Sequence, residues 1–235
     1  ARFGYAVGPH SWKRYLFPPR IRLWRAHRDL AVEEDPVDER PLAFVGVRGC
    51  ELHAIAIQDR VLLGGSHIDP DYAARRGGAV VVAVVCGEPG ETCFCASLDT
   101  CPEAGEGHDL ALTGLLDGTH RFLARAGTER GGDLLAEIDG GEPREEDVAA
   151  AAAVHDRARA RMGRTLDVHA LRDVLLANLD HPRWDDVASR CVACANCTLV
   201  CPTCFCTAVE DTADLAGEEA ERFRVWDSCF STDYS

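Results

Sequence analysis

Half of the chain's 12 cysteines lie between Cys191 and Cys206, and this run limits what the segment can form more than any other feature. The first four cysteines have the spacing C-x2-C-x2-C-x3-C-P, the bacterial pattern of ligands for a [4Fe-4S] cluster. They are Cys191, Cys194, Cys197 and Cys201. The small residues between them let the backbone curl around an inorganic core, and Pro202 then turns the chain away because it has no amide hydrogen and a fixed φ. The spacing therefore predicts an iron–sulfur cluster.

Structural zinc and disulfide bonds are the alternatives for this run. Zinc prefers two cysteine pairs separated by a longer loop, so its fourth ligand would come from an irregular position here. Disulfides fit less well, because we expect a substantial core and no signal peptide, and closely spaced cysteines in such a chain suit a metal. The pattern favours the cluster over both.

Composition limits the class of protein. The 235 residues are 46% hydrophobic, enough for one large domain or two smaller ones. No apolar run approaches the ~20 residues of a membrane span, so we expect a soluble protein. The formal net charge of -14 opposes binding to nucleic acid or anionic membranes. The cysteines are expected to be free thiols, which need reducing conditions, so we predict a cytoplasmic location. The abrupt end at Ser235 suggests a fragment.

Residues 1–40 are predicted to be an N-terminal arm and linker. Residues 1–28 mix aromatic side chains, among them Phe3, Tyr5 and Trp12, with lysine and arginine. We expect an extended arm whose rings pack on the body or on a partner subunit, because the overall charge opposes a nucleic-acid patch. A charged linker with two prolines follows at residues 33–41.

Residues 41–140 are predicted to form an α/β domain. Two apolar runs, at 42–47 and 79–85, flank a helical pattern that begins near Glu51, which indicates a parallel βαβ unit. Asp117-Gly118 between two alternating segments predicts a hairpin, and a short helix follows from Gly131.

The glycines of Gly46-Val-Arg-Gly49 suit a turn better than a phosphate site, because the full G-x-G-x-x-G pattern is missing. Cys50 would have a depressed pKa if partly exposed at the helix start, although a buried hydrophobic role is the commoner one. Farther along, Thr92-Cys93-Phe94-Cys95 is repeated as Thr203-Cys204-Phe205-Cys206. The repeat indicates either that both loops contact one redox region or that chance or packing accounts for it. A C-x-C pair is too tight for a good disulfide.

Residues 141–235 are predicted to form a helical, ferredoxin-like 4Fe-4S domain. Helices are expected at about 144–162 and 168–179, framing the cysteine run. His155 and His169 lie in these helices without partners at ligand spacing. The acidic stretch from Glu210 to Glu221 is expected to be a solvated surface or linker.

Further segments carry a resemblance to a known family. The chain resembles the iron–sulfur (beta) subunit of soluble NiFe hydrogenases and sulfhydrogenases, and is similar to one of the subunits of anaerobic sulfite reductase. The segments that carry this resemblance are residues 46–60, 92–95, 109–113 and 225–230, in addition to the cysteine run. Such subunits relay electrons between a flavin subunit that handles NAD(P)H and a catalytic subunit, and normally hold two [4Fe-4S] clusters.

The resemblance also implies a set of ligands. Cys191, Cys194 and Cys197 would bind the first cluster, and Cys201 would belong to a second one whose own motif lies downstream in the family. The fourth ligand of the first cluster stays open, with four candidates. These are Cys201, Cys204, Cys206 and Cys229.

We expect an electron-transfer subunit with no catalytic residues of its own. The first alternative is a structural zinc-binding interaction module without redox activity. The second is an enzyme whose residues 42–140 bind a flavin or nucleotide. The terminal electron acceptor and the direction of electron flow are left open by the sequence.

Overall fold

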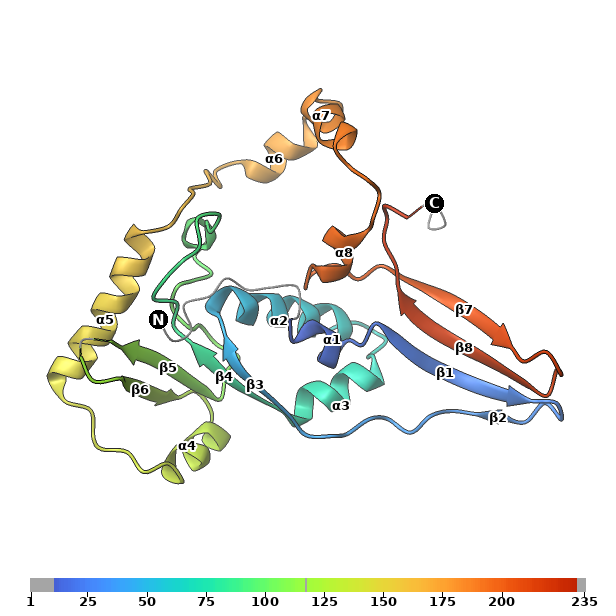
Figure 1. Ribbon diagram of the computed structural model, residues 1–235, viewed down its shortest axis with the longest axis horizontal. Helices are drawn as coiled ribbons and strands as arrows, with labels where there is room; N and C mark the ends of the chain where they lie inside the picture. The colour runs from blue at the N-terminus through green and yellow to red at the C-terminus, as the bar shows by residue number, and fades with distance from the viewer. Residues whose placement is uncertain (1–10, 117, 232–235) are drawn as a thin grey trace.

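The computed structural model describes residues 11–116 and 118–231. Within these residues the chain forms two four-stranded sheets, one mixed and one antiparallel, with helices around them (Figure 1). Phe3 and Tyr5 of the predicted arm and Asp117 of the predicted hairpin lie outside the described residues. None of the described helices is long and apolar enough to cross a bilayer.

The mixed sheet has the strand order β3-β4-β5-β6. Its elements in chain order are β3 (Leu42–Val47), α2 (Gly49–Leu62), α3 (Pro70–Gly78), β4 (Ala79–Val84), the 3-10 turn η1 (Cys95–Leu98), β5 (Leu110–Leu115), β6 (Arg121–Ala126) and α4 (Glu129–Ala136). Strands β3 and β4 are parallel, and β5 and β6 form an antiparallel hairpin. The predicted βαβ unit and hairpin are therefore confirmed.

The N-terminal segment contributes to the core of this α/β unit. The helix α1 (Lys13–Leu16) is short, yet Trp12, Leu16 and Phe17 are buried in one cluster with Ile55 of α2 and Tyr72 of α3. The prediction that the arm packs its rings on the body is confirmed for Trp12 and Phe17. Burying large aromatic side chains anchors this end of the chain to the α/β unit.

Backbone geometry explains the two glycines of Gly46-Val-Arg-Gly49. Gly46 has a φ of 97°, at a shift of register between β3 and β4. A Cβ atom at Gly49 would lie 2.2 Å from the carbonyl oxygen of Glu103. Both positions need glycine for steric reasons, which favours a turn over a phosphate site.

The antiparallel sheet joins the two ends of the chain, in the order β2-β1-β8-β7. Its strands are β1 (Arg20–His27), β2 (Val32–Glu33), β7 (Thr207–Ala213) and β8 (Glu219–Trp226). The expected solvated surface at Glu210–Glu221 is confirmed, because residues 210–219 are exposed. The alternative of a linker is wrong, because most of this stretch is in strands. The ion pairs Arg22–Glu221 and Arg20–Glu210 offset its negative charge across the sheet.

The helical prediction for residues 141–235 holds only in part. The helices are α5 (Glu145–Ala160), α6 (Leu171–Leu176), α7 (Arg183–Ser189) and α8 (Asn196–Val200). The predicted helix at 168–179 is shorter, and Val174 and Leu175 are exposed. In Figure 1, α6 and α7 lie away from both sheets, so the long predicted helices do not frame the cysteine run. The helical, ferredoxin-like description does not hold beyond Cys206, because the strands β7 and β8 follow there. The domain boundaries at 1–40, 41–140 and 141–235 stay predictions.

Candidate metal centre

The backbone of the cysteine run curls as its small residues predict. Ala193 and Ala195 have φ values of 51° and 59°, a conformation that costs about 1–2 kcal/mol for a residue with a Cβ atom. The amide of Ala193 donates to Sγ of Cys191 at 3.4 Å. Strained backbone that directs amides at thiols is typical of a functional site, and it suits a bound cluster.

Three distant segments anchor the second half of the run. The ammonium group of Lys13 donates to the carbonyl oxygens of Leu199 and Cys201, at 3.3 and 2.9 Å. The Gln58 side chain of α2 donates to the carbonyl oxygen of Pro202 at 2.6 Å. In α8, the hydroxyl of Thr198 donates to Oγ of Ser228, and both side chains are buried. The loop is thus bound to α1, α2 and the segment after β8.

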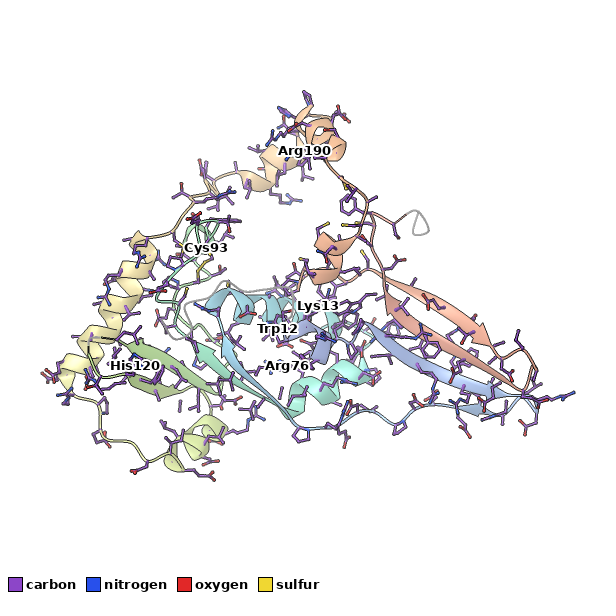
Figure 2. All side chains as sticks on the ribbon, in the orientation of Figure 1. Trp12, Lys13, Arg76, Cys93, His120 and Arg190 are labelled. Atoms are coloured by element: carbon purple, nitrogen blue, oxygen red, sulfur yellow. A yellow bond between two sulfur atoms is a disulfide. The ribbon has the colours of Figure 1, made fainter. Side chains whose placement is uncertain are left out.

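Lys13 is a buried cation next to thiols. Its residue is only 3% exposed, and its Nζ lies 4.2 Å from the centroid of the Trp226 ring (Figure 2). Burial lowers the pKa of Lys13, and the nearby Cys204, Cys201 and Cys206 oppose this shift by favouring the charged form. A buried ammonium is costly unless negative charge lies near it, so this position suits thiolates or an anionic cluster.

The thiols around Lys13 do not have equal acidity. Burial raises the pKa of Cys201, but hydrogen bonds from Thr203 and Cys204 and the charge of Lys13 outweigh it, so the pKa is below its ordinary value. Burial, the hydrogen bond to Cys201 and the charge of Cys201 raise the pKa of Cys204 to about 11. Cys201 is therefore the more acidic thiol of the pair.

The structure separates the predicted ligands into two sets. Cys191, Cys194 and Cys197 are exposed on the loop and the start of α8. Cys201, Cys204 and Cys206 are half-buried, and their charges would act on Lys13. The remaining candidate, Cys229, is exposed beside the buried Ser228. The assignment of Cys191, Cys194, Cys197 and Cys201 as ligands stays a prediction.

In the part of the chain that the structure describes, no three His, Cys, Asp or Glu side chains are already placed to hold a metal ion. This agrees with the chemistry of thiolate sites, where ligands must lose protons and metal binding is coupled to folding of the loop. An all-sulfur donor set suits iron–sulfur clusters or zinc. The fit of the run to a cluster therefore depends on its donors and its buried cation.

Sequence spacing gave no sign of the anchoring residues. Lys13 is 188 residues from Cys201, and Gln58 is 144 residues from Pro202. The expectation that all the cysteines are free is also wrong, because Cys95 and Cys101 form a disulfide. The other ten cysteines are free thiols.

Comparisons with known proteins agree with the chemistry of the site. Residues 190–235 match the family model of the 4Fe-4S dicluster domain. Over this segment the chain is therefore similar to iron–sulfur domains of the 4Fe-4S type. It is a homologue of sulfhydrogenase 2 subunit beta from Pyrococcus furiosus, with 33% identity over 220 residues, which cover 93% of this chain and 63% of that relative. No solved structure is significantly similar to the chain.

Proposed function

We propose that the chain is an electron-transfer subunit of an oxidoreductase complex. The observation that carries this proposal is the cysteine run itself, which lies within the matched 4Fe-4S dicluster domain and next to the buried Lys13. The similarity to a sulfhydrogenase beta subunit supports it. A bound cluster supplies one-electron oxidation and reduction.

The residues of this chain hold the cofactor and set its surroundings. Cys191, Cys194, Cys197 and Cys201 are the proposed ligands, and Cys204, Cys206 and Cys229 are the other candidates for the fourth position. The positive charge of Lys13 favours added negative charge at the half-buried thiols. Gln58 and Thr198 hold the loop in place by hydrogen bonds. Rigid anchoring keeps reorganisation of the ligands small when the charge changes.

The partners follow from the resemblance and are proposed with it. They are a flavin-containing, NAD(P)H-linked subunit and a catalytic subunit of the NiFe hydrogenase or sulfite reductase type. The relative is by name one subunit of a sulfhydrogenase, which supports assembly with other chains. A cytoplasmic location is proposed because ten cysteines are free thiols.

Anaerobic purification tests the function directly. We expect a brown protein that contains iron and acid-labile sulfide and gives an electron paramagnetic resonance signal after reduction. Cys194→Ser should reduce the iron content, whereas Val192→Ser, which changes an exposed neighbour in the same loop, should not. A colourless protein with zinc at Cys191–Cys201 would reject the relay and support the structural zinc module.

A further inference from the structure

A second group of cysteines lies in the α/β unit, outside the matched dicluster domain. Cys50 is in the first turn of α2, and Cys86 follows β4 after one residue. Cys93 lies in the next loop, where Figure 2 labels it, and Cys95 and Cys101 are joined by a disulfide. Three chain segments thus contribute thiols to this end of the mixed sheet.

Backbone contacts bring these segments together. Gly49, next to Cys50, is so close to the loop that an added Cβ would lie 3.0 Å from the carbonyl oxygen of Thr100 and 2.2 Å from that of Glu103. The amide of Cys86 donates to the carbonyl oxygen of Pro102 at 3.1 Å. The start of α2 and the end of β4 therefore both contact residues 100–103, which include Cys101.

The thiols are close enough to affect one another. Burial raises the pKa of Cys50 to about 11, and the charges of Glu51, Cys86 and Cys93 add to the rise. This corrects the expectation of a depressed pKa at the helix start. Ionising several partly buried thiols next to one another is costly, because the anions repel one another, unless a metal neutralises their charge.

Positive charge is also available here. The backbone amides at the N-terminus of a helix attract anions, and α2 is 14 residues long. The charge of Arg48 favours the thiolate of Cys50, and this arginine is 3% exposed. Both groups of cysteines therefore lie beside a buried cation, Lys13 in one and Arg48 in the other.

We propose that Cys50, Cys86, Cys93 and Cys95 bind a further iron–sulfur cluster, separate from any cluster at the C-terminal cysteine run. Cys95 is the fourth ligand because it is less buried than Cys101 and lies two residues from Cys93. Its thiol becomes available when a dithiol reductant supplies two electrons and two protons to the Cys95–Cys101 bond and is itself oxidised to a disulfide. The four ligand thiols then lose their protons as the cluster binds.

Helix α2 connects this site to the C-terminal cysteine run. Cys50 is in its first turn, and Gln58 contacts Pro202 from a position about 12 Å farther along the helix, at 1.5 Å per residue. A cluster at Cys50 thus extends the proposed relay into the α/β unit. This extension rests on the proposed function, whereas binding of the cluster does not.

The test measures iron and acid-labile sulfide per full-length chain, purified without oxygen and reconstituted with ferrous iron and sulfide in the presence of dithiothreitol. Cys86→Ser and Cys93→Ser should each lose about four iron atoms per chain, the content of one cube. Each should also lose one electron paramagnetic resonance signal of the reduced protein. Cys194→Ser should lose a different signal, so failure at one site is distinguished from failure at the other.

A matched pair of variants tests the fourth ligand. Cys95→Ala and Cys101→Ala both break the disulfide, but only Cys95→Ala should lose the cluster. Equal iron loss in both variants would overturn the assignment of Cys95 as the ligand. Full iron content in both Cys86→Ser and Cys93→Ser, or zinc in place of iron at these cysteines, would overturn the proposal. Cys93 lies in a loop, so Cys93→Ser keeps the test valid if Cys86→Ser fails to fold.

Discussion

The ammonium group of Lys13 donates a hydrogen bond of 2.9 Å to the carbonyl oxygen of Cys201, across 188 residues of sequence. This contact brings a positive charge from the N-terminal helix α1 to the last cysteine of the C-x2-C-x2-C-x3-C pattern. The same charge favours the ionised forms of Cys201 and Cys204. The surroundings of the candidate metal centre are therefore set by both ends of the chain.

Lys13→Met should lower the midpoint potential of the cluster at the C-terminal run by on the order of 50 mV. A unit charge roughly 10 Å away, at an effective dielectric of about 20, contributes about 1.7 kcal/mol before screening. Losing the cation disfavours the reduced form, which carries more negative charge. A redox titration followed by electron paramagnetic resonance measures the change. Lys13→Arg keeps the charge and should retain most of the potential; a potential that is the same in Lys13→Met and the native chain contradicts the assigned role.

Cys201 should be alkylated faster than Cys204 in the reduced, metal-free chain at neutral pH. The thiolate is the nucleophile, and the pKa of Cys201 is lowered whereas that of Cys204 is raised to about 11. Thr203→Val removes the hydroxyl contact to Sγ of Cys201, so the pKa should rise and labelling should slow several-fold. Peptide mass spectrometry after timed iodoacetamide treatment gives both rates. Faster labelling of Cys204 would show that the two pKa shifts are assigned to the wrong thiols.

The local parts of the fold could be predicted from the sequence. The apolar runs at 42–47 and 79–84 form parallel strands because buried strands of α/β sheets are almost wholly apolar. The small residues Ala193 and Ala195 adopt the curled backbone that the cysteine spacing requires. In these segments a pattern within a few residues decides the structure.

The pairing of the two chain ends had no comparable local signal. Arg22 and Glu221 form an ion pair across 199 residues, and neither residue alone indicates a strand. The acidic stretch resembled a linker because its partner arginines lie on β1. The contacts of Lys13 and Gln58 with the cysteine loop were missed for the same reason, since they depend on the tertiary fold. In α6 the error was the opposite: a helix expected to frame the cysteine run is short and lies with Val174 and Leu175 exposed.

Cys50 should make the stability of the reduced, metal-free chain fall as the pH rises from about 9 to about 11. The pKa of this thiol is about 11 in the folded chain against an ordinary value of 9.0. In this window the folded state therefore binds more protons than the unfolded state, and the free energy of unfolding decreases with pH. Below pH 9 the contribution is fully present. Urea unfolding of the native chain and of Cys50→Ala measures it as a difference; identical pH profiles would contradict it.

Gln58→Met should make the loop after Cys201 less firmly held. The variant removes the 2.6 Å hydrogen bond to the carbonyl oxygen of Pro202, a half-buried residue. An acceptor left unsatisfied there costs at most about 1–3 kcal/mol, the range for buried groups. We expect iron to be lost to a chelator faster than from the native chain. Ile57→Met places the same side chain one position earlier, where the native residue is 39% exposed, and should leave the rate unchanged. Equal rates in the two variants would show that this bond does not hold the loop.

Ala195→Val should weaken retention of the cluster at the C-terminal run. Ala195 has a φ of 59° just before α8, and a β-branched side chain is more strongly disfavoured there than alanine. The added strain opposes the curled backbone of the cysteine run. Iron loss to a chelator should therefore be faster by at least several-fold. Ala188→Val makes the same change in the exposed helix α7, where the backbone is helical, and should have little effect. If both variants keep iron equally well, the left-handed backbone at Ala195 is not needed to hold the cluster.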